Sequence, residues 1–287
     1  MVGEQHVRMV GYPVIGRSGL GNELFPWARC AVWCHEHSAP MLRPQFRQIH
    51  IGPYVRRESD KRQYHRLFLN PGYISGWQRF SSIRLRPRLR EGEEPGLHGG
   101  TIWFQGMSGL FERLLDRSET VRAELRRMTR PEYLPPSSAR GFIAVHIRRG
   151  DFSTASSDEV LRSGEWNYRL PLNWFEHGIT EVRRLSGPNT PVVVFSDGSD
   201  DELRPILTMP HVVRSSRISA VTDLLEMSQS DALIASGSTF SMWASYLGQM
   251  PTLWFPGLLR QRVLGPARAA AECELDLGQS LSSAFLS

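Results

Sequence analysis

The C-terminal half of the chain alternates between short apolar runs and segments of helical period, and this alternation restricts the folds it can adopt. The apolar runs have strand length and are rich in β-branched residues, so strands are expected at residues 142–147, 192–195, 212–213, 232–235 and 252–255. Helices are expected between them, at residues 172–185, 201–207, 220–228 and 240–247. This order predicts βαβ units in a doubly wound parallel sheet, and the nearly continuous apolar strands indicate that both of its faces are covered.

The N-terminal half begins in the same way. A strand is expected at residues 8–15, then a glycine-rich turn at 16–22, then a helix from about 23 to 37 with Pro26 in its first turn, where proline is tolerated. Residues 43–100 show no clean period, and a second helix is expected near 110–128. Prolines make residues 129–140 the best linker. We therefore predict an α/β fold of two Rossmann-like domains, residues 1–136 and 137–287.

Composition excludes several classes of protein. The 287 residues are 40% hydrophobic, which is enough for real cores and too much for a disordered chain. The N-terminal residues contain no apolar stretch long enough for a signal peptide or a membrane span. Three cysteines give no disulfide framework. We expect a soluble, cytoplasmic protein with at most peripheral membrane association, and the sequence predicts no oligomeric state.

The basic charge does not point to nucleic acid. The net charge is only +5, the arginines are dispersed, and no zinc-finger spacing or base-reading basic helix is present. The alternating arginines of residues 84–90 are interpreted as a solvated loop in preference to a binding arm. Nucleic acid is not an expected partner and remains a minor hypothesis, which predicts an affinity that falls steeply with salt.

A glycine-rich loop follows the first expected strand. In an open α/β sheet, ligands bind beyond the carboxyl ends of the strands. Gly16, Gly19 and Gly21 are expected to let the loop turn with positive φ and to let a ligand approach the backbone. Asn22 can cap the helix or direct its amide at a ligand. The spacing is not a dinucleotide fingerprint, and a simple strand–helix turn is an equal alternative.

The second motif, HIRRGD, follows the strand at 142–147. It brings His146, Arg148 and Arg149 to the edge of the sheet, and Gly150 permits a sharp turn before Asp151. Two arginines beyond a buried strand need anionic partners, and the planar guanidinium suits phosphate oxygens. The alternative is a structural ion pair between arginine and aspartate.

The third motif places Ser236, Gly237, Ser238 and Thr239 between a strand and the helix that starts at Phe240. Hydroxyl groups at a helix amino end make an anion site, and they also make an ordinary helix cap; both can hold at once. Together with the arginine motif and the Asn-bearing loop, this predicts a pyrophosphate-containing ligand.

Metal-dependent phosphate binding is not indicated, because no Walker motif and no Asp-x-Asp occur. The acidic run that starts at Asp197 is interpreted as a strand end followed by a capped helix start. Cys30 and Cys34, with His35 and His37 nearby, are interpreted as packed helix cysteines in preference to a metal site.

Four segments together resemble the α1,2-fucosyltransferase family. They are GNELF in the glycine loop, WFQGMSGLFERLLDRSETVRAEL at Trp103 to Leu125, HIRRGDF, and DLLEMSQSDALIASGSTFSMWASYLG. Their order and spacing match the family over most of the chain, most weakly at residues 43–100. The chain departs from the family pattern at Glu23, at Pro26-Trp27, at Gly237 and at Met242.

The resemblance implies a GT-B-like fold with a nucleotide-sugar cleft between the two domains. It further implies an inverting, metal-independent transferase that moves fucose from GDP-fucose to a hydroxyl of a glycan or glycoside. It implies that Arg148 grips the β-phosphate, that His146 seats the nucleotide and that Arg149 supports the site. Ser238, Thr239 and Phe240 would line the diphosphate and nucleoside pocket, with Asp223 near them or positioning its helix. The full expected donor set is Gly19, Gly21, Asn22, His146, Arg148, Arg149, Asp197, Asp223, Ser238, Thr239 and Phe240.

The catalytic residues expected are Arg148, Asn22, which would approach the fucose and diphosphate from the N-terminal domain, and Asp151. Asp151 is the nominee for general base, with Asp158 and Glu159 behind it. The loop of residues 153–168, with Trp166 and Tyr168, is expected to border the acceptor. No cofactor and no metal are expected. Two alternatives stay open: the same fold with another GDP-sugar donor, and a non-catalytic protein that binds a nucleotide or a carbohydrate.

Overall fold

The structure is a computed structural model that describes residues 9–46, 64–93, 99–136, 141–216 and 218–287. The chain forms two compact units. Among the described residues, unit 1 comprises residues 9–130 and unit 2 comprises residues 131–287. Residues 137–140 of the linker expected from the sequence lie outside the described residues. Within the described ranges, no helix is both long and apolar enough to cross a bilayer.

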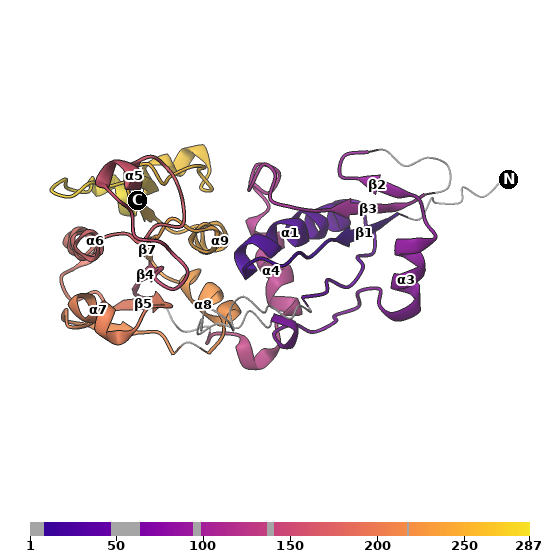
Figure 1. Ribbon diagram of the computed structural model, residues 1–287, viewed down its shortest axis with the longest axis horizontal. Helices are drawn as coiled ribbons and strands as arrows, with labels where there is room; N and C mark the ends of the chain where they lie inside the picture. The colour runs from indigo at the N-terminus through magenta and orange to yellow at the C-terminus, as the bar shows by residue number, and fades with distance from the viewer. Residues whose placement is uncertain (1–8, 47–63, 94–98, 137–140, 217) are drawn as a thin grey trace. The chain divides into compact units, whose positions relative to one another are not determined.

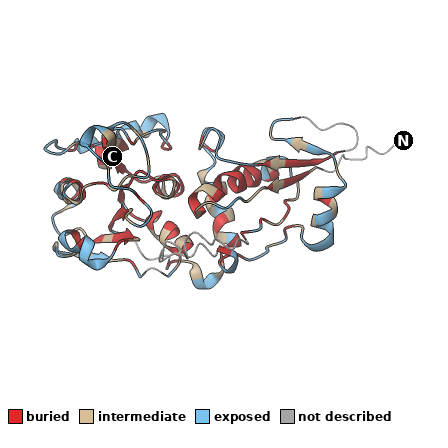
Figure 2. Cartoon of the chain, viewed as in Figure 1, coloured by how far each residue is buried: buried red, intermediate tan, exposed pale blue. Residues whose placement is uncertain are grey.

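Unit 1 has a three-stranded parallel sheet in the order β1-β3-β2 (Figure 1). The strands are β1 (Val10–Pro13), β2 (Arg88–Arg90) and β3 (Thr101–Phe104). The helices are α1 (Leu20–Glu36), α3 (Gly76–Arg84) and α4 (Ser118–Met128), with a 3-10 turn η1 (Tyr64–Arg66). Helix α1 packs on both β1 and α4, and Figure 2 shows it buried along most of its length.

The cysteines of α1 are packing residues. Their sulfur atoms lie so close to Gly11 of β1 that a Cβ there would be 2.5 Å from Cys34 Sγ and 2.7 Å from Cys30 Sγ. Burial raises the pKa of the Cys30 thiol well above its usual value. The two residues therefore bring α1 close to the sheet, as the packing interpretation predicts.

Unit 1 also corrects three expectations. Residues 88–90 form an edge strand and not a loop, because Leu89 pairs with Ile102 while the Arg88 guanidinium lies 3.8 Å from the centre of the Trp103 ring. Helix α3 lies in the region that shows no period. The helix expected near 110–128 begins only at Ser118, since the preceding residues form turns.

Unit 2 has a six-stranded parallel sheet in the order β6-β5-β4-β7-β8-β9, which confirms the predicted sheet type. The strands are β4 (Ile143–Ile147), β5 (Val192–Ser196), β6 (Val212–Arg214), β7 (Ala232–Ile234), β8 (Thr252–Trp254) and β9 (Glu272–Glu274). The helices are α5 (Asp158–Arg162), α6 (Leu172–Ser186), α7 (Asp200–Leu207), α8 (Ala220–Met227) and α9 (Thr239–Gly248). In Figure 1, α6 and α7 lie on one side of this sheet and α8 and α9 on the other.

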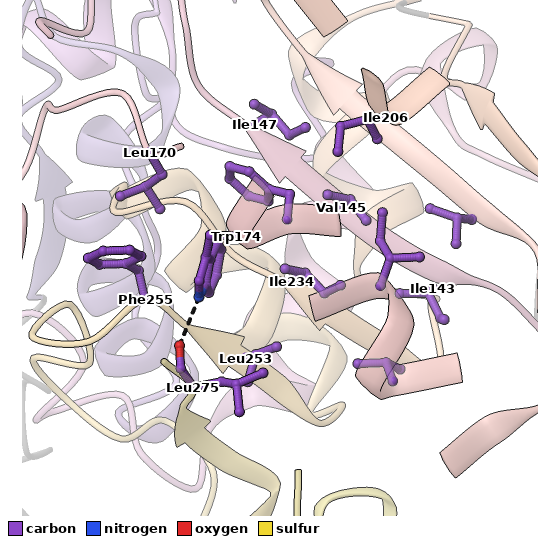
Figure 3. Close-up of a cluster of buried hydrophobic side chains, with 14 of the residues drawn as sticks. Ile143, Val145, Ile147, Leu170, Trp174, Ile206, Ile234, Leu253, Phe255 and Leu275 are labelled. Carbon is purple, nitrogen blue, oxygen red and sulfur yellow. Dashed lines mark hydrogen bonds between the residues drawn. The ribbon is translucent and has the colours of Figure 1, made fainter. Parts of the chain in front are cut away.

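A large hydrophobic cluster of unit 2 lies between one face of the sheet and helices α6 and α7. Alternate residues of β4 (Ile143, Val145 and Ile147) pack into it (Figure 3). Trp174 of α6 is fully buried there, and its indole Nε1 donates to the Leu275 carbonyl at 2.8 Å. Each such side chain stabilises the fold by about 1.5–3 kcal/mol through its removal from water. The core therefore fixes β4, and with it the orientation of the residues that follow.

Candidate active site

Three neighbouring strands of unit 2 end in the residues singled out from the sequence. Ile147 of β4 pairs in register with Ser196 of β5, so Arg148 and Asp197 leave the sheet side by side. On the other side of β4, β7 ends in the serine-rich turn at Ser236. Because all strands are parallel, these carboxyl ends lie along one edge of the sheet, where ligands bind in open α/β folds.

Arg148 is held by two carboxylates. Its Nη2 lies 2.5 Å from Asp151 Oδ1, and its Nε lies 3.2 Å from Asp197 Oδ2. The guanidinium carbon also lies 4.9 Å from the centre of the Phe152 ring. The structural ion pair proposed as an alternative is therefore present, and it leaves the guanidinium fixed in direction and partly exposed. Such a fixed guanidinium can present its remaining N–H groups to an anion.

The second arginine is held differently. The backbone N–H of Arg149 donates to Asp197 Oδ1 at 2.7 Å, while its half-buried side chain packs against Gly198. Burial lowers the pKa of the Arg149 guanidinium. Its Nε is buried and has no hydrogen-bond partner among the described residues. Arg149 is thus anchored to Asp197 through its backbone, and its supporting role in the site stays a prediction.

Two glycines make this arrangement possible. A Cβ at Gly150 would lie 2.6 Å from Asp197 Oδ2, and one at Gly198 would lie 2.8 Å from Arg149 Cγ. Both distances are shorter than side-chain carbons tolerate, so any larger residue would displace the arginine or the aspartate. The glycine of the HIRRGD motif is needed for close approach of Asp197.

The His146 side chain lies on the face of β4 opposite to the core residues Val145 and Ile147, and it contacts α9 through Ser241. Its side chain is buried, and its Nδ1 lies 2.7 Å from Ser241 Oγ and 3.2 Å from Ser236 Oγ. Burial, with a smaller contribution from the charge of Arg148, lowers the pKa of His146 to about 3. The imidazole is therefore neutral at physiological pH. It joins the central strand to the amino end of α9 through the two hydroxyl groups.

The amino end of α9 is capped as predicted. Ser238 is the N-cap, and its Oγ accepts from the Ser241 N–H at 3.2 Å. Thr239 and Phe240 open the helix, and the Phe240 ring centre lies 5.3 Å from that of His146. The remaining first-turn amides and the helix dipole favour an anion at this end. The cap and the anion site are compatible here.

The other acidic residues take separate places. Asp223 lies in the first turns of α8 and accepts from Ser215 Oγ at 3.3 Å, next to the end of β6. Asp158 and Glu159 are exposed in the first turn of α5, which Ser157 caps. Of the three candidate bases, the structure places only Asp151 beside Arg148.

The loop of residues 153–168 is closed by a bridge between Ser153 and Tyr168. Trp166 is partly buried and packs against the core, with the Arg260 guanidinium 4.8 Å from its ring centre. Both contacts anchor the loop to the rest of unit 2. The expectation that this loop borders the acceptor stays a prediction.

The glycine loop of unit 1 differs from the expectation. None of Gly16, Gly19 and Gly21 has a positive φ. The loop is instead held by the carboxylate of Glu23, which accepts from the Gly16 N–H, from the Ser18 N–H at 2.7 Å and from Ser18 Oγ at 2.5 Å. The Glu23 side chain is only 4% exposed. A buried carboxylate therefore occupies the concave side of the loop and gives it its shape.

Helix α1 also begins earlier than expected, at Leu20, with Gly19 as N-cap. Gly21 and Asn22 therefore lie in its first turn, and Asn22 is partly exposed. Pro26 lies inside the helix and not in its first turn, and it supplies no N–H for the Asn22 carbonyl.

Two residues of these sites were missed from the sequence. Ser241 is the nearer partner of His146, and Glu23 holds the glycine loop. Ser241 lies three residues after the predicted cap, which is the position of the amide that a cap accepts from, and this spacing is a usable signal. Glu23 had no signal in its own segment beyond its departure from the family pattern.

Comparison with solved structures shows which class of fold this is. A structure of NodZ α1,6-fucosyltransferase soaked with GDP-fucose has a TM-score of 0.53 and 16% identity, covering 86% of this chain and 94% of that chain. NodZ co-crystallized with GDP has a TM-score of 0.52, with the same identity and coverage. Fucosyltransferase NodZ from Bradyrhizobium has a TM-score of 0.52 and 16% identity over 85% and 93% of the two chains. The fold is thus the GT-B-like fold of these enzymes.

The family follows from the sequence comparison. The family described as Glycosyl transferase family 11 matches residues 100–254, which run from β3 to β8 and contain both the HIRRGD motif and the serine-rich turn. The chain belongs to this family, which confirms the resemblance found in its motifs. The protein is a glycosyltransferase. No sequence among curated proteins matches the chain significantly.

Proposed function

We propose that the protein transfers fucose from GDP-fucose to a hydroxyl of a glycan or glycoside, with inversion and without a metal ion. The observation that carries the proposal is the edge of the unit 2 sheet, where Arg148, Arg149 and the amino end of α9 present donors beside a neutral His146. Family membership supports the reaction class, and the NodZ structures with GDP and GDP-fucose support the donor.

In this proposal the diphosphate lies against Arg148 and the first turn of α9. Arg148 donates to the β-phosphate, and the amides behind Ser238 and Thr239 donate to phosphate oxygens. Phe240 contacts the nucleoside, and Asp197 and Asp223 fix the surroundings through the arginines and Ser215. His146 seats the nucleotide by holding α9 in place through Ser241.

The same donors act most strongly as the reaction proceeds. The departing GDP gains negative charge as the bond to fucose breaks, so a fixed guanidinium stabilises the transition state more than the bound donor. Loss of one such donor typically costs about 3 kcal/mol. Because arginine and amide dipoles neutralise this charge, a metal is not required for it. No group of three or more His, Cys, Asp or Glu residues suited to a metal occurs among the described residues.

The acceptor hydroxyl needs only modest activation if the bond to GDP is largely broken first. Asp151 is the proposed base, but its carboxylate is paired with Arg148, so it must exchange this partner for the acceptor hydroxyl. The geometry supports an orienting role for Asp151 at least as strongly. Asn22, on unit 1, is proposed to contact the sugar or the diphosphate of the donor.

Calorimetry with GDP, UDP and ADP, with EDTA present throughout, tests the donor site. We expect GDP alone to bind, and Arg148→Ala to weaken binding by about two orders of magnitude, the equivalent of about 3 kcal/mol. Arg204→Ala is the matched control, because Arg204 makes a similar ion pair with Asp201 at 2.5 Å on the exposed face of α7. In Arg148→Ala the Asp151 carboxylate loses Arg148 as a partner and can repel the phosphates of GDP. The double variant Arg148→Ala/Asp151→Asn removes that repulsion, and GDP binding should stay weak in it if the loss comes from the missing guanidinium.

Turnover assays with GDP-fucose and other GDP-sugars then test the sugar. Fucose transfer, abolished in Arg148→Ala and kept in Arg204→Ala, would support the proposal. Transfer of another sugar would favour the alternative donor, and GDP binding without any transfer would favour a non-catalytic protein. Binding that requires a divalent metal would contradict the proposed mechanism.

A further inference from the structure

Unit 1 contains a cavity of about 630 Å³ for which neither the motifs nor the family match provides a ligand. It lies between β1, the segment 43–46 and α3, which stands apart from α1 and α4 in Figure 1. Its volume is within the range of small-molecule sites. Aromatic rings form much of its wall, from Tyr12, Phe46, Phe68 and Phe80.

Positive charge gathers on the other part of the wall. Arg43, Arg79 and Arg84 line the cavity, and no acidic side chain does so in the part of the chain that the structure describes. None of these arginines has an ion-pair partner within the described ranges. Three arginines without a carboxylate repel one another, and a negatively charged ligand would relieve that repulsion.

One of the three is already fixed in position. Arg79 donates from Nε to the Arg43 carbonyl at 3.1 Å and from Nη2 to the Tyr12 hydroxyl at 3.3 Å. Its guanidinium carbon lies 5.1 Å from the centre of the Tyr12 ring. The side chains of Arg43 and Arg84 make no such contacts with the residues that the structure describes. The cavity therefore combines one oriented cation with two that can still adjust to a ligand.

Helix α3 adds two further features. Its N-cap, Ser75, makes no side-chain cap bond, and Ser75 and Gly76 line the cavity, so the helix dipole adds to the positive wall. Phe80 stacks on Trp77 with ring centres 5.1 Å apart and planes inclined by 27°. These two side chains are 48% and 75% exposed, which is unusual for a pair of large aromatic residues. The aromatic wall thus continues onto the surface.

We propose that this cavity binds a negatively charged sugar, with its phosphate or carboxylate at Arg43 and Arg79 and its ring against Phe80. Aromatic faces pack against the C–H groups of sugar rings, and arginines bind the anionic substituent. The choice of a carbohydrate over other anions rests on the chain's being a glycosyltransferase, and not on the donor proposed above. Every described residue that lines the cavity belongs to unit 1, and neither the glycine loop nor the sheet edge that carries Arg148 contributes to the described wall.

Calorimetry on the full chain, with glucose 6-phosphate, glucuronate, glucose and inorganic phosphate as probes, tests this site. We expect one of the two anionic sugars to bind with 1:1 stoichiometry and more tightly than glucose or phosphate, and the tighter of the two identifies the anion. Arg43→Gln and Phe80→Ala should each weaken binding by about tenfold or more. Arg126→Gln is the control, because Arg126 lies on α4 of the same unit and does not line the cavity.

Three results with the wild-type protein would overturn the proposal: no binding of either anionic sugar, binding of phosphate as tight as that of the sugar phosphate, or tighter binding of AMP than of any sugar. An equal loss of affinity in Arg126→Gln would also do so, since it would show a non-specific effect of charge. GDP binding, measured on the same variants, should be unchanged. A wild-type protein that binds an anionic sugar but not GDP would contradict the proposed donor and leave this site standing.

Discussion

Acidification should destabilise the protein through His146, and the size of the effect follows from its burial. The folded imidazole has a pKa of about 3, against an ordinary value of 6.5. Below pH 6.5 the unfolded chain takes up a proton at this residue while the folded chain does not, so the free energy of unfolding falls as the pH falls. The limiting slope is about 1.4 kcal/mol per pH unit. Because the unfolded imidazole is half protonated at pH 6.5, the loss amounts to about 2 kcal/mol between pH 6.5 and pH 4.5, and to about 3 kcal/mol between pH 7.5 and pH 4.5. Above about pH 7.5 the residue contributes almost no pH dependence.

Urea unfolding of the wild type and of His146→Asn, at several pH values from 7.5 to about 4.5, isolates this contribution. The variant carries no imidazole at this position, while every carboxylate titrates in both proteins, so the difference between the two curves reports His146 alone. We expect the wild type to lose about 3 kcal/mol more than the variant over the acid range. Parallel curves would refute the reasoning, because they would mean that the folded imidazole accepts a proton near its ordinary pKa.

Three further predictions concern packing and the glycine loop. Glu23→Gln should lower the free energy of unfolding by about 2 kcal/mol, because the NH2 of the amide cannot accept and must face one of the N–H donors of Gly16 and Ser18. The exposed Glu119→Gln is the control, and an equal loss of stability in both variants would contradict this account. Gly11→Ala should lower the free energy of unfolding, measured by thermal unfolding, by about 1–3 kcal/mol, because its Cβ would overlap the sulfur atoms of Cys30 and Cys34. Unchanged stability would mean that α1 can move away from β1. Trp174→Phe should lower the free energy of unfolding by about 1–3 kcal/mol, because it removes the hydrogen bond to the Leu275 carbonyl and part of the ring volume. GDP affinity should be unchanged, and a large loss of affinity would show that GDP binding depends on packing in this core.

Unit 2 could be predicted from the sequence because its signals are local. The runs around Ile143, Val192 and Leu233 are apolar on both faces, as buried parallel strands require. Strand β9 was not predicted, since its sequence is ECE. Glu272 can lie buried in this strand because its carboxylate accepts from the N–H groups of Val263 and Leu264, a contact that no local pattern reveals.

Unit 1 could be predicted less well, because its elements depend on distant contacts. Strand β2 carries two exposed arginines and is recognisable only from its pairing with β3. The loop before α1 is held by hydrogen bonds to the Glu23 carboxylate, and not by the positive φ values that its glycines suggested. Residue types alone could not distinguish a loop shaped by glycine from one shaped by a buried acid.

The candidate site shows the same division. The strand ends that carry Arg148, Asp197 and Ser238 follow from topology, and topology was predictable. The pairing of Arg148 with both Asp151 and Asp197 depends on side-chain geometry, so the sequence left the ion pair and the phosphate site as alternatives. The structure contains the ion pair, and it leaves the phosphate site to experiment.

The ion pairs around Arg148 have a consequence for the speed of ligand capture. Arg148 and Arg149 are balanced by Asp151 and Asp197, so this cluster attracts a distant anion only weakly. The association rate of an anionic nucleotide with it should therefore change little with ionic strength. The cavity of unit 1 has three arginines and no acid on its described wall, and capture there should slow markedly as salt is added. Because its charges are balanced, the Arg148 cluster selects its ligand by short-range contacts, whereas the cavity of unit 1 attracts an anionic ligand from a distance.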